Sequence, residues 1–196
     1  DVKSGSNKKV WWKCDEGDDH EWEAIIKNRT KGSRCAVCYG KKVVQSNCLQ
    51  TLNPNLSKEW HPTKNKDLSP LNFTSGSHKK VWWKCPLGND HEWIASIGDR
   101  SNGSGCPICR GLKVVNSNCL LTTDPKISSE WYYKKNGEIT PKNIIAGSSK
   151  KVWWKCPKGD DHEWEASPNN RTNNKSSCPV CKNQKVVKTN SLEYVN

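Results

Sequence analysis

A ten-residue phrase, G-S-x-K-K-V-W-W-K-C, occurs three times in this 196-residue chain. Its copies end at Cys14, Cys85 and Cys156, so the repeat has a period of 71 residues. Self-similarity at a fixed period is typical of repeat architectures, in which each copy is one small structural unit. The sequence therefore predicts three equivalent modules joined by two equivalent linkers.

Each copy carries a histidine after its first cysteine, and then two cysteines separated by two residues. The pattern is C-x5-H-x14-C-x2-C in the first two copies, and the third has one additional residue before its final pair. Zinc prefers thiolate and imidazole ligands in tetrahedral structural sites, and four protein ligands leave no position for a catalytic water. We expect three structural Zn²⁺ ions, bound by Cys14, His20, Cys35 and Cys38, by Cys85, His91, Cys106 and Cys109, and by Cys156, His162, Cys178 and Cys181.

Two alternatives compete with zinc. A disulfide framework would have to accommodate eleven cysteines, an odd number, of which nine fall into three identical sets with a histidine. In the other alternative each histidine is a bystander beside a three-cysteine site. The two remaining cysteines, Cys48 and Cys119, share one repeat position where the third copy has Ser191, and we expect a packed small side chain there.

Composition favours small metal-stabilised modules over one large core. Only 33% of the residues are hydrophobic, with eleven tryptophans, one phenylalanine and no methionine. Units this short bury little apolar surface and usually need a covalent or metal cross-link. Zinc binding contributes about 10–16 kcal/mol per site in zinc-finger peptides near pH 7.

The pattern of strand-forming residues and turns predicts a hairpin in each module. Residues Lys80–Cys85 are expected to form one strand and His91–Ser96 its partner, with Gly88 in the turn between them, as Gly17 and Gly159 are in the other copies. Residues Lys113–Val115 and their equivalents are expected to form a further short strand. If the first strand alternates, Val81, Trp83 and Cys85 face the metal and the core, and Lys80, Trp82 and Lys84 lie on the opposite face.

The linkers are expected to be ordered. Asn53-Pro54 and Asp124-Pro125 are typical of a helix N-cap followed by proline at the first helical position, opening a short helix that ends near a Glu-Trp pair at Trp60 or Trp131. We expect fingers at residues 1–52, 71–123 and 142–196, separated by linkers at 53–70 and 124–141. Both chain ends fall inside a repeat, which suggests a segment of a longer repeat protein.

These motifs resemble a known family. K-K-V-W-W-K-C, then G-x-x-H-E-W, then C-P-x-C followed by K-V-V, with E-W-H-P-T-K-N in the first linker, are similar to the probable treble-clef or zinc-ribbon repeats. These occur in tandem arrays in large DNA viruses, bacteria and plants, sometimes beside nuclease domains. The resemblance implies a small metal-stabilised α+β fold, three tandem treble-clef or zinc-ribbon-like fingers with short β-hairpins, and a role with nucleic acid.

Two features depart from that family's pattern. The segment between the first cysteine and the histidine is longer here, with acidic pairs such as Asp18-Asp19. The second linker has Tyr132 where the first has His61, so His61 is not a repeat-wide ligand.

Charge independently favours a nucleic-acid partner. Lysine and arginine exceed aspartate and glutamate by 32 − 20 = 12, and zinc loading changes each site by −1, which leaves about +9. Such a surplus attracts polyanions. A tryptophan between two lysines suits stacking on a base while the ammonium groups meet phosphate. Candidate nucleic-acid contacts are Lys9, Trp11, Lys13 and Arg29, Lys80, Trp82, Lys84 and Arg100, and Lys151, Trp153, Lys155 and Arg171.

These candidates have structural alternatives. The linker tryptophan could cover the outward tryptophan, and each recurring arginine could pair with a carboxylate or a loop carbonyl. The principal hypothesis is a non-catalytic zinc-finger array that binds nucleic acid, DNA in preference to RNA, mainly through backbone phosphates. The alternative is a structural or protein-interaction component of a large assembly, such as a virion or a ribonucleoprotein.

An enzyme is the least favoured reading. Every recurring histidine is assigned to a metal site, and the acidic pair before it, which could hold Mg²⁺, is broken by Asn89 in the second copy. No small-molecule substrate is expected. No membrane partner is expected either, because no apolar run approaches the roughly 20 residues that span a bilayer. Reduced thiolates favour an intracellular reducing compartment or a virus particle.

Overall fold

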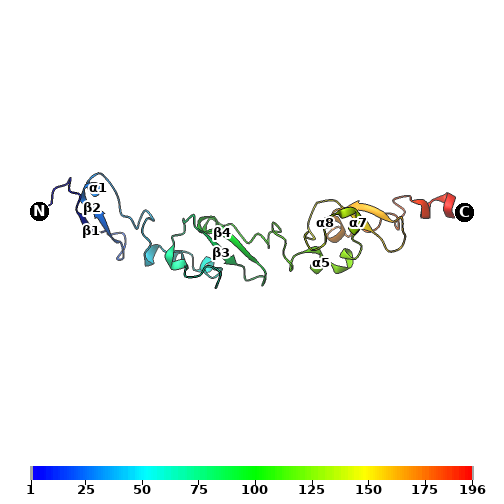
Figure 1. Ribbon diagram of the computed structural model, residues 1–196, viewed down its shortest axis with the longest axis horizontal. Coiled ribbons are helices and arrows are strands. Elements are labelled where there is room, and N and C mark those ends of the chain that lie inside the picture. The colour runs from blue at the N-terminus through cyan, green and yellow to red at the C-terminus, as the bar shows by residue number, and fades with distance from the viewer. Residues whose placement is uncertain (1, 196) are drawn as a thin grey trace. The chain divides into compact units, whose positions relative to one another are not determined.

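The computed structural model describes residues 2–195, and within it the chain divides into two compact units, residues 1–105 and 106–196. Figure 1 follows the elements along the chain. The first unit contains β1 (Lys9–Lys13), β2 (Glu21–Ile25), α1 (Ile26–Thr30), the 3₁₀ turn η1 (Gln45–Asn47), α2 (Leu49–Leu52), α3 (Pro54–Ser57), the 3₁₀ turn η2 (Pro70–Asn72), β3 (Lys80–Lys84), β4 (Glu92–Ser96) and α4 (Ile97–Ser101).

The second unit holds one hairpin, preceded by the short helices of the second linker. It contains α5 (Leu120–Thr123), α6 (Pro125–Ser128), α7 (Tyr133–Asn136), β5 (Val152–Lys155), β6 (Glu163–Ala166), α8 (Pro168–Thr172), the 3₁₀ turn η3 (Lys188–Asn190) and α9 (Leu192–Val195). No helix in the described part of the chain is both long and apolar enough to cross a membrane.

Each finger is built on a two-stranded antiparallel hairpin, as the sequence predicts. The register pairs Trp12 with Trp22, and the same tryptophan pair recurs as Trp83 with Trp93 and as Trp154 with Trp164. The first tryptophan of each pair also donates its indole N–H to the carbonyl of an alanine on the partner strand, at 2.9–3.1 Å. Paired aromatic residues across the strands therefore fix the register, which places the cysteine and the histidine at the same end of the hairpin.

The strands alternate as expected. Val81, Trp83 and Cys85 are buried, whereas Lys80 is exposed and Trp82 and Lys84 are intermediate. The third finger has the same pattern over residues 151–156. One face of each hairpin thus packs on the metal-binding core, and its other face carries the lysines.

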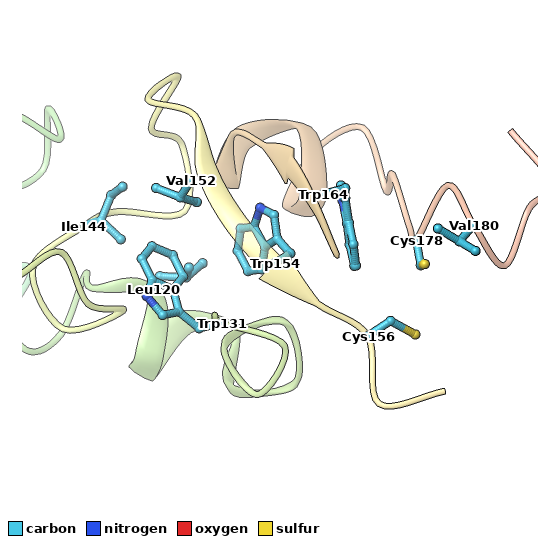
Figure 2. Packing of buried hydrophobic residues seen from close by; sticks show 9 residues of the cluster. All are labelled: Leu120, Trp131, Ile144, Val152, Trp154, Cys156, Trp164, Cys178 and Val180. Atoms are coloured by element: carbon cyan, nitrogen blue, oxygen red, sulfur yellow. The ribbon is translucent and has the colours of Figure 1, made fainter. Parts of the chain in front are cut away.

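The linker adds a third chain to the edge of the hairpin. Trp60 forms an isolated antiparallel bridge with Trp83, and Trp131 forms one with Trp154. In the second unit this contact completes a core around Trp154. Figure 2 shows Trp154 between Trp131 and Leu120 on one side and Trp164 with Cys156 and Cys178 on the other.

Two expectations about local structure are wrong. Residues Lys113–Val115 form no strand. Strand-like backbone pairing occurs instead a few residues later, at two isolated bridges, Cys48 with Thr74 and Cys119 with Ile145. A strand needs a neighbour to satisfy its backbone groups, and here the side-chain amide of Asn118 takes that role by bonding to Val115 N–H and Lys113 C=O.

Helices α3 and α6 do begin at a proline, but neither Asn53 nor Asp124 caps its helix with a side chain. The Asn53 amide donates instead to Ser75 Oγ, 3.3 Å away. Helices α2, α5 and α7, each a single turn, were not expected from the sequence, because four residues show no helical period.

Candidate metal centres

Four ligand atoms converge at the end of the first hairpin. Cys14 follows β1, His20 precedes β2, and Cys35 and Cys38 lie in a turn after α1. All four ligand atoms lie within 4.8 Å of one another. His20 Nδ1 is 3.3 Å from Cys38 Sγ and 3.9 Å from Cys35 Sγ, and Cys14 Sγ is 3.7 Å from Cys38 Sγ.

The third finger repeats this geometry despite its additional loop residue. His162 Nδ1 is 3.4 Å from Cys181 Sγ and 3.7 Å from Cys178 Sγ, and Cys156 Sγ is 3.7 Å from Cys181 Sγ. The corresponding side chains of the second finger, Cys85, His91, Cys106 and Cys109, also form such a group. The three groups comprise the twelve side chains that the spacing predicts.

These distances fit zinc. Tetrahedral bonds of about 2.3 Å to sulfur and about 2.0 Å to nitrogen place neighbouring ligand atoms roughly 3.5–3.8 Å apart. A disulfide requires about 2.0 Å between sulfurs, and all eleven cysteines, which lie within residues 2–195, are free. Three sulfurs and one imidazole nitrogen fill a tetrahedral shell, so the chain has three structural zinc sites of the Cys₃His type.

The thiols need a cation beside them. Burial, and then the neighbouring thiols Cys35 and Cys14, raise the pKa of Cys38 to about 12. Burial, and then the thiols Cys156 and Cys178, raise the pKa of Cys181 to about 11. Burial also opposes ionisation of Cys35, but backbone N–H groups of Cys38 and Val37 outweigh it and lower the pKa of Cys35. A bound dication favours the thiolates, and the turn supplies further donors.

A serine and an aspartate position the first histidine. Ser46 Oγ lies 3.3 Å from His20 Nε2, the nitrogen that faces away from the sulfurs. Asp19 in turn accepts the Ser46 backbone N–H at 2.8 Å and the Ser46 hydroxyl at 2.7 Å, and these two hydrogen bonds lower the pKa of Asp19. Such contacts fix the ring orientation of a metal ligand. In the sequence, the only signal for these two residues is an aspartate directly before the histidine and a serine 26 residues after it.

The third finger uses a threonine in the same place. Asp161 accepts the backbone N–H of Thr189 at 2.9 Å and its hydroxyl at 2.7 Å, and both bonds lower the pKa of Asp161. The second aspartate of each pair thus anchors the turn after the cysteine pair. This role accounts for Asp19 and Asp161 without a magnesium ion.

The glycine three residues before each histidine is required by close packing. A Cβ atom on Gly17 would lie 2.7 Å from His20 Cδ2, and one on Gly159 would lie 2.6 Å from His162 Cδ2. Both distances are far below van der Waals contact. Any side chain here would displace the histidine from the metal.

The linker Glu-Trp pair docks on the face of the following finger. The ring of Trp60 meets that of Trp83 edge-on with centroids 5.5 Å apart, and Trp131 meets Trp154 at 5.2 Å. The linker tryptophan therefore packs on the inward tryptophan of the strand. The alternative in which the linker tryptophan covers the outward tryptophan is therefore wrong.

The preceding glutamate pairs with the recurring arginine. Arg100 Nη2 lies 2.5 Å from Glu59 Oε2, its Nη1 donates to the Ser104 carbonyl, and its guanidinium lies 5.2 Å from the ring centroids of both Trp83 and Trp93. Arg171 repeats this arrangement with Glu130 at 2.7 Å. Both arginines are buried, 7% and 5% exposed. The structure places both in the linker–finger junction, where the ion pair withdraws them from solvent. Arg29 is half-buried and bonds to the Ser33 carbonyl.

The outward tryptophans of the second and third fingers are partly covered by other linker residues. Lys64 lies 4.4 Å above the Trp82 ring and pairs with Glu92, and Lys135 lies 4.2 Å above the Trp153 ring. The hydrogen bond from Lys64, with a second from His61, lowers the pKa of Glu92 to about 2. Tyr132 supplies the equivalent hydrogen bond to Glu163, which explains how tyrosine replaces His61.

The strand lysines lie on the surface. Lys13, Lys84 and Lys155 stand opposite glutamates at 3.8–3.9 Å, in solvent-accessible pairs whose length and screening leave them little effect on stability. Lys9, Lys80 and Lys151 are exposed, and each follows another exposed lysine. Trp11 is 66% exposed, with Lys42 Nζ 5.6 Å from its ring centroid.

Comparison with known families supports the zinc assignment. Residues 1–41, 56–112 and 127–184 match a family model described as a probable treble clef zinc finger domain. The three matches include all twelve metal ligands, and the second and third also include the docked tryptophans Trp60 and Trp131. No curated protein matches the chain.

Proposed function

The chain belongs to the family of probable treble clef zinc finger domains, and on that premise we propose that its three zinc-organised fingers bind nucleic acid through the backbone phosphates, with DNA the expected polymer. The net charge of +12 supports a polyanionic partner. Counterion release from such a polymer favours association with a basic surface.

One observation carries the proposal. Two consecutive exposed lysines stand where the chain enters the first strand of each finger: Lys8 and Lys9, Lys79 and Lys80, and Lys150 and Lys151. Among residues 2–195, no ion pair is recorded for any of these six side chains, whereas the lysine at the other end of each strand stands opposite a glutamate. The six ammonium groups are therefore available to phosphate.

Aromatic stacking is a second, smaller contribution. Trp11 is the most exposed tryptophan of the hairpins and lies between Lys9 and Lys13 in the strand. A base stacked on such a ring contributes about 1–3 kcal/mol without selecting a sequence. Binding is accordingly proposed to be weakly sequence-dependent.

The array is proposed to act without catalysis. Each zinc has four protein ligands, so a water molecule has no coordination position at which to be activated. Asp19 and Asp161, the acidic side chains nearest the first and third sites, are engaged by Ser46 and Thr189.

A lysine-block experiment tests this function. Fluorescence anisotropy would measure binding of the zinc-loaded chain to duplex DNA and to RNA from about 50 to 200 mM salt. If six lysines each meet a phosphate, log K should fall with log salt with a slope of about −5 on duplex DNA. Replacing all six with glutamine should abolish most of that dependence.

A charge-matched variant is the control. Glutamine at six other exposed lysines, Lys31, Lys58, Lys126, Lys142, Lys175 and Lys182, removes the same charge elsewhere. It should retain most of the affinity and most of the slope. Equal losses in the two variants would show that net charge alone drives association, and no binding at low salt would exclude this function.

A further inference from the structure

One position on the outward face of the hairpin, the face that carries the strand lysines, sets the second finger apart from the other two. The register pairs Trp82 with Ile94 in the second finger. In the other two fingers the equivalent tryptophan is paired with a glutamate: Trp11 with Glu23, and Trp153 with Glu165. Side chains directly opposite each other in an antiparallel pair lie close together on one face, so this residue borders the tryptophan.

Another glutamate recurs on this face, and it is neutralised in the second and third fingers alike. Glu92 is paired with Lys64 and lies 3.8 Å from the ammonium group of Lys84. Glu163 is held in the same way by a linker lysine at 2.7 Å and a strand lysine at 3.9 Å. Since both carboxylates are compensated locally, they do not distinguish the second finger from the third.

Glu23 and Glu165 have no such compensation. Both side chains are exposed, and within residues 2–195 no ion pair is recorded for either of them. A carboxylate beside the strand lysines repels the phosphate that the lysines attract. The hairpin contributes two lysines and one glutamate to this face in the second finger, but two lysines and two glutamates in the first and the third. The outward face of the second finger is therefore the most favourable one for a phosphate.

The same position also gives this face an apolar surface. Ile94 is 52% exposed, and Trp82 beside it is partly exposed. The ammonium group of Lys64 lies 4.4 Å from the centroid of the Trp82 ring, at the border of the apolar pair. An isoleucine gains nothing from a phosphate, but packing it against a base removes apolar surface from water. A single strand can present a base in this way, whereas the bases of a duplex are stacked on one another.

We propose that the outward face of the second finger binds an unpaired base of single-stranded DNA together with the phosphates beside it. The base packs on Ile94 and on the exposed part of the Trp82 ring, and the ammonium groups of Lys64, Lys80 and Lys84 contact the phosphates. In the first and third fingers a glutamate stands where the base would pack, which makes those faces weaker base sites. This inference rests on the proposed nucleic-acid function and narrows its polymer to a single strand.

Fluorescence anisotropy tests this with a labelled DNA strand of about 15 nucleotides and with the duplex of the same sequence. The zinc-loaded chain should bind the single strand more tightly than the duplex. Ile94→Glu gives the second finger the glutamate of the other two, and it should weaken single-strand binding about tenfold, because packing on a base is lost and a negative charge is added. Duplex affinity should change far less, since it depends on the lysine pairs of all three fingers.

Leu87→Glu is the matched control in the same finger. It replaces another exposed aliphatic side chain, 79% exposed, with a carboxylate. The ratio of single-strand to duplex affinity should remain that of the unaltered chain. Zinc content measured on each variant checks that the fingers remain folded.

The third finger offers the reverse experiment. Glu165→Ile gives Trp153 the partner that Trp82 has, and it should raise single-strand affinity about threefold or more. Glu138→Ile makes the same change at an exposed position of the second linker and should leave the affinity ratio unaltered.

The possible failures are distinct. An Ile94→Glu variant with an unaltered affinity ratio, or a Leu87→Glu variant with the same loss, would overturn this inference and leave the phosphate contacts of the array in place. Absence of binding to either form of DNA at about 50 mM salt would exclude the nucleic-acid function itself, and this inference with it.

Discussion

Arg171 and Glu130 lie 41 residues apart in the sequence, and their side chains meet at 2.7 Å in the junction between the second linker and the third finger. The guanidinium stacks between Trp154 and Trp164, with ring centroids 4.7 and 5.0 Å away. Such a contact requires the linker and the finger to fold as one unit. The 71-residue repeat therefore joins each finger to the linker that precedes it.

Removing the glutamate charge should destabilise that junction. Glu130→Gln leaves the buried Arg171 cation with a neutral partner, and we expect a loss of about 1–3 kcal/mol in the free energy of unfolding. Urea denaturation of the zinc-loaded chain measures it. Glu165→Gln, at an exposed position on β6, should change stability by less than about 0.5 kcal/mol; similar losses in both variants would contradict a specific role for the pair.

The linker tryptophan should contribute more to stability than the outward one. Trp131 is 4% exposed and its indole N–H donates to the Ile139 carbonyl at 3.2 Å, so Trp131→Ala leaves a cavity that costs about 3–5 kcal/mol. Trp11→Ala removes an exposed ring and should cost about 0.5 kcal/mol or less. Thermal denaturation followed by circular dichroism compares the two; a Trp11→Ala variant as unstable as Trp131→Ala would mean that Trp11 is covered in solution.

The serine beside the first histidine should tune its metal affinity. Ser46→Ala removes the hydroxyl that lies against His20 Nε2 and bonds to Asp19, and comparable losses weaken metal binding 10- to 100-fold. Competition with a chromogenic chelator should then release one zinc ion per chain ahead of the other two. Ser33→Ala removes an exposed hydroxyl of the same finger and should leave all three ions equally retained.

Cysteine replacement should separate ligands from packed thiols. Cys48 is fully buried, donates to the Gln45 carbonyl and occupies the position of Ser191, so Cys48→Ser should retain three zinc ions per chain. Cys38→Ser should retain two. Elemental analysis of purified protein counts the ions, and a zinc loss on Cys48→Ser would contradict its assignment as a packing residue.

Chelation should unfold the fingers. Each site is expected to contribute about 10–16 kcal/mol near pH 7, more than a small hydrophobic core provides. Excess EDTA should therefore expose tryptophans that are now buried, such as Trp154 at 0% exposure, and shift their emission to longer wavelength. Unchanged emission after complete zinc removal would show that the hydrophobic clusters suffice alone.

Sequence patterns predicted those features of the structure that depend on residues close together in the chain. The cysteine and histidine spacing indicated the metal ligands, and the alternation of residues 80–85 indicated which side chains turn inward. The same rules were wrong about residues 113–115, where a β-prone run has no neighbouring strand, and about Asn53, whose side chain bonds to Ser75 and does not cap α3. At Asn53 a partner 22 residues away decided the outcome, whereas at residues 113–115 the nearby side chain of Asn118 took the place of a neighbouring strand.

The sequence by itself determined the repeat, because its period of 71 residues can be read directly. It also determined the chemistry of the three zinc sites and the hairpin beside each one, because the ligands of one site span no more than 25 positions, from Cys14 to Cys38 and from Cys156 to Cys181. Only the tertiary structure decided the role of the recurring Arg100 and Arg171, which pair with linker glutamates 41 residues earlier and are withdrawn from solvent. The sequence shows the same arginine whether its side chain contacts water, phosphate or a buried carboxylate. Its desolvation, and therefore its role, depends on which distant segment folds against it.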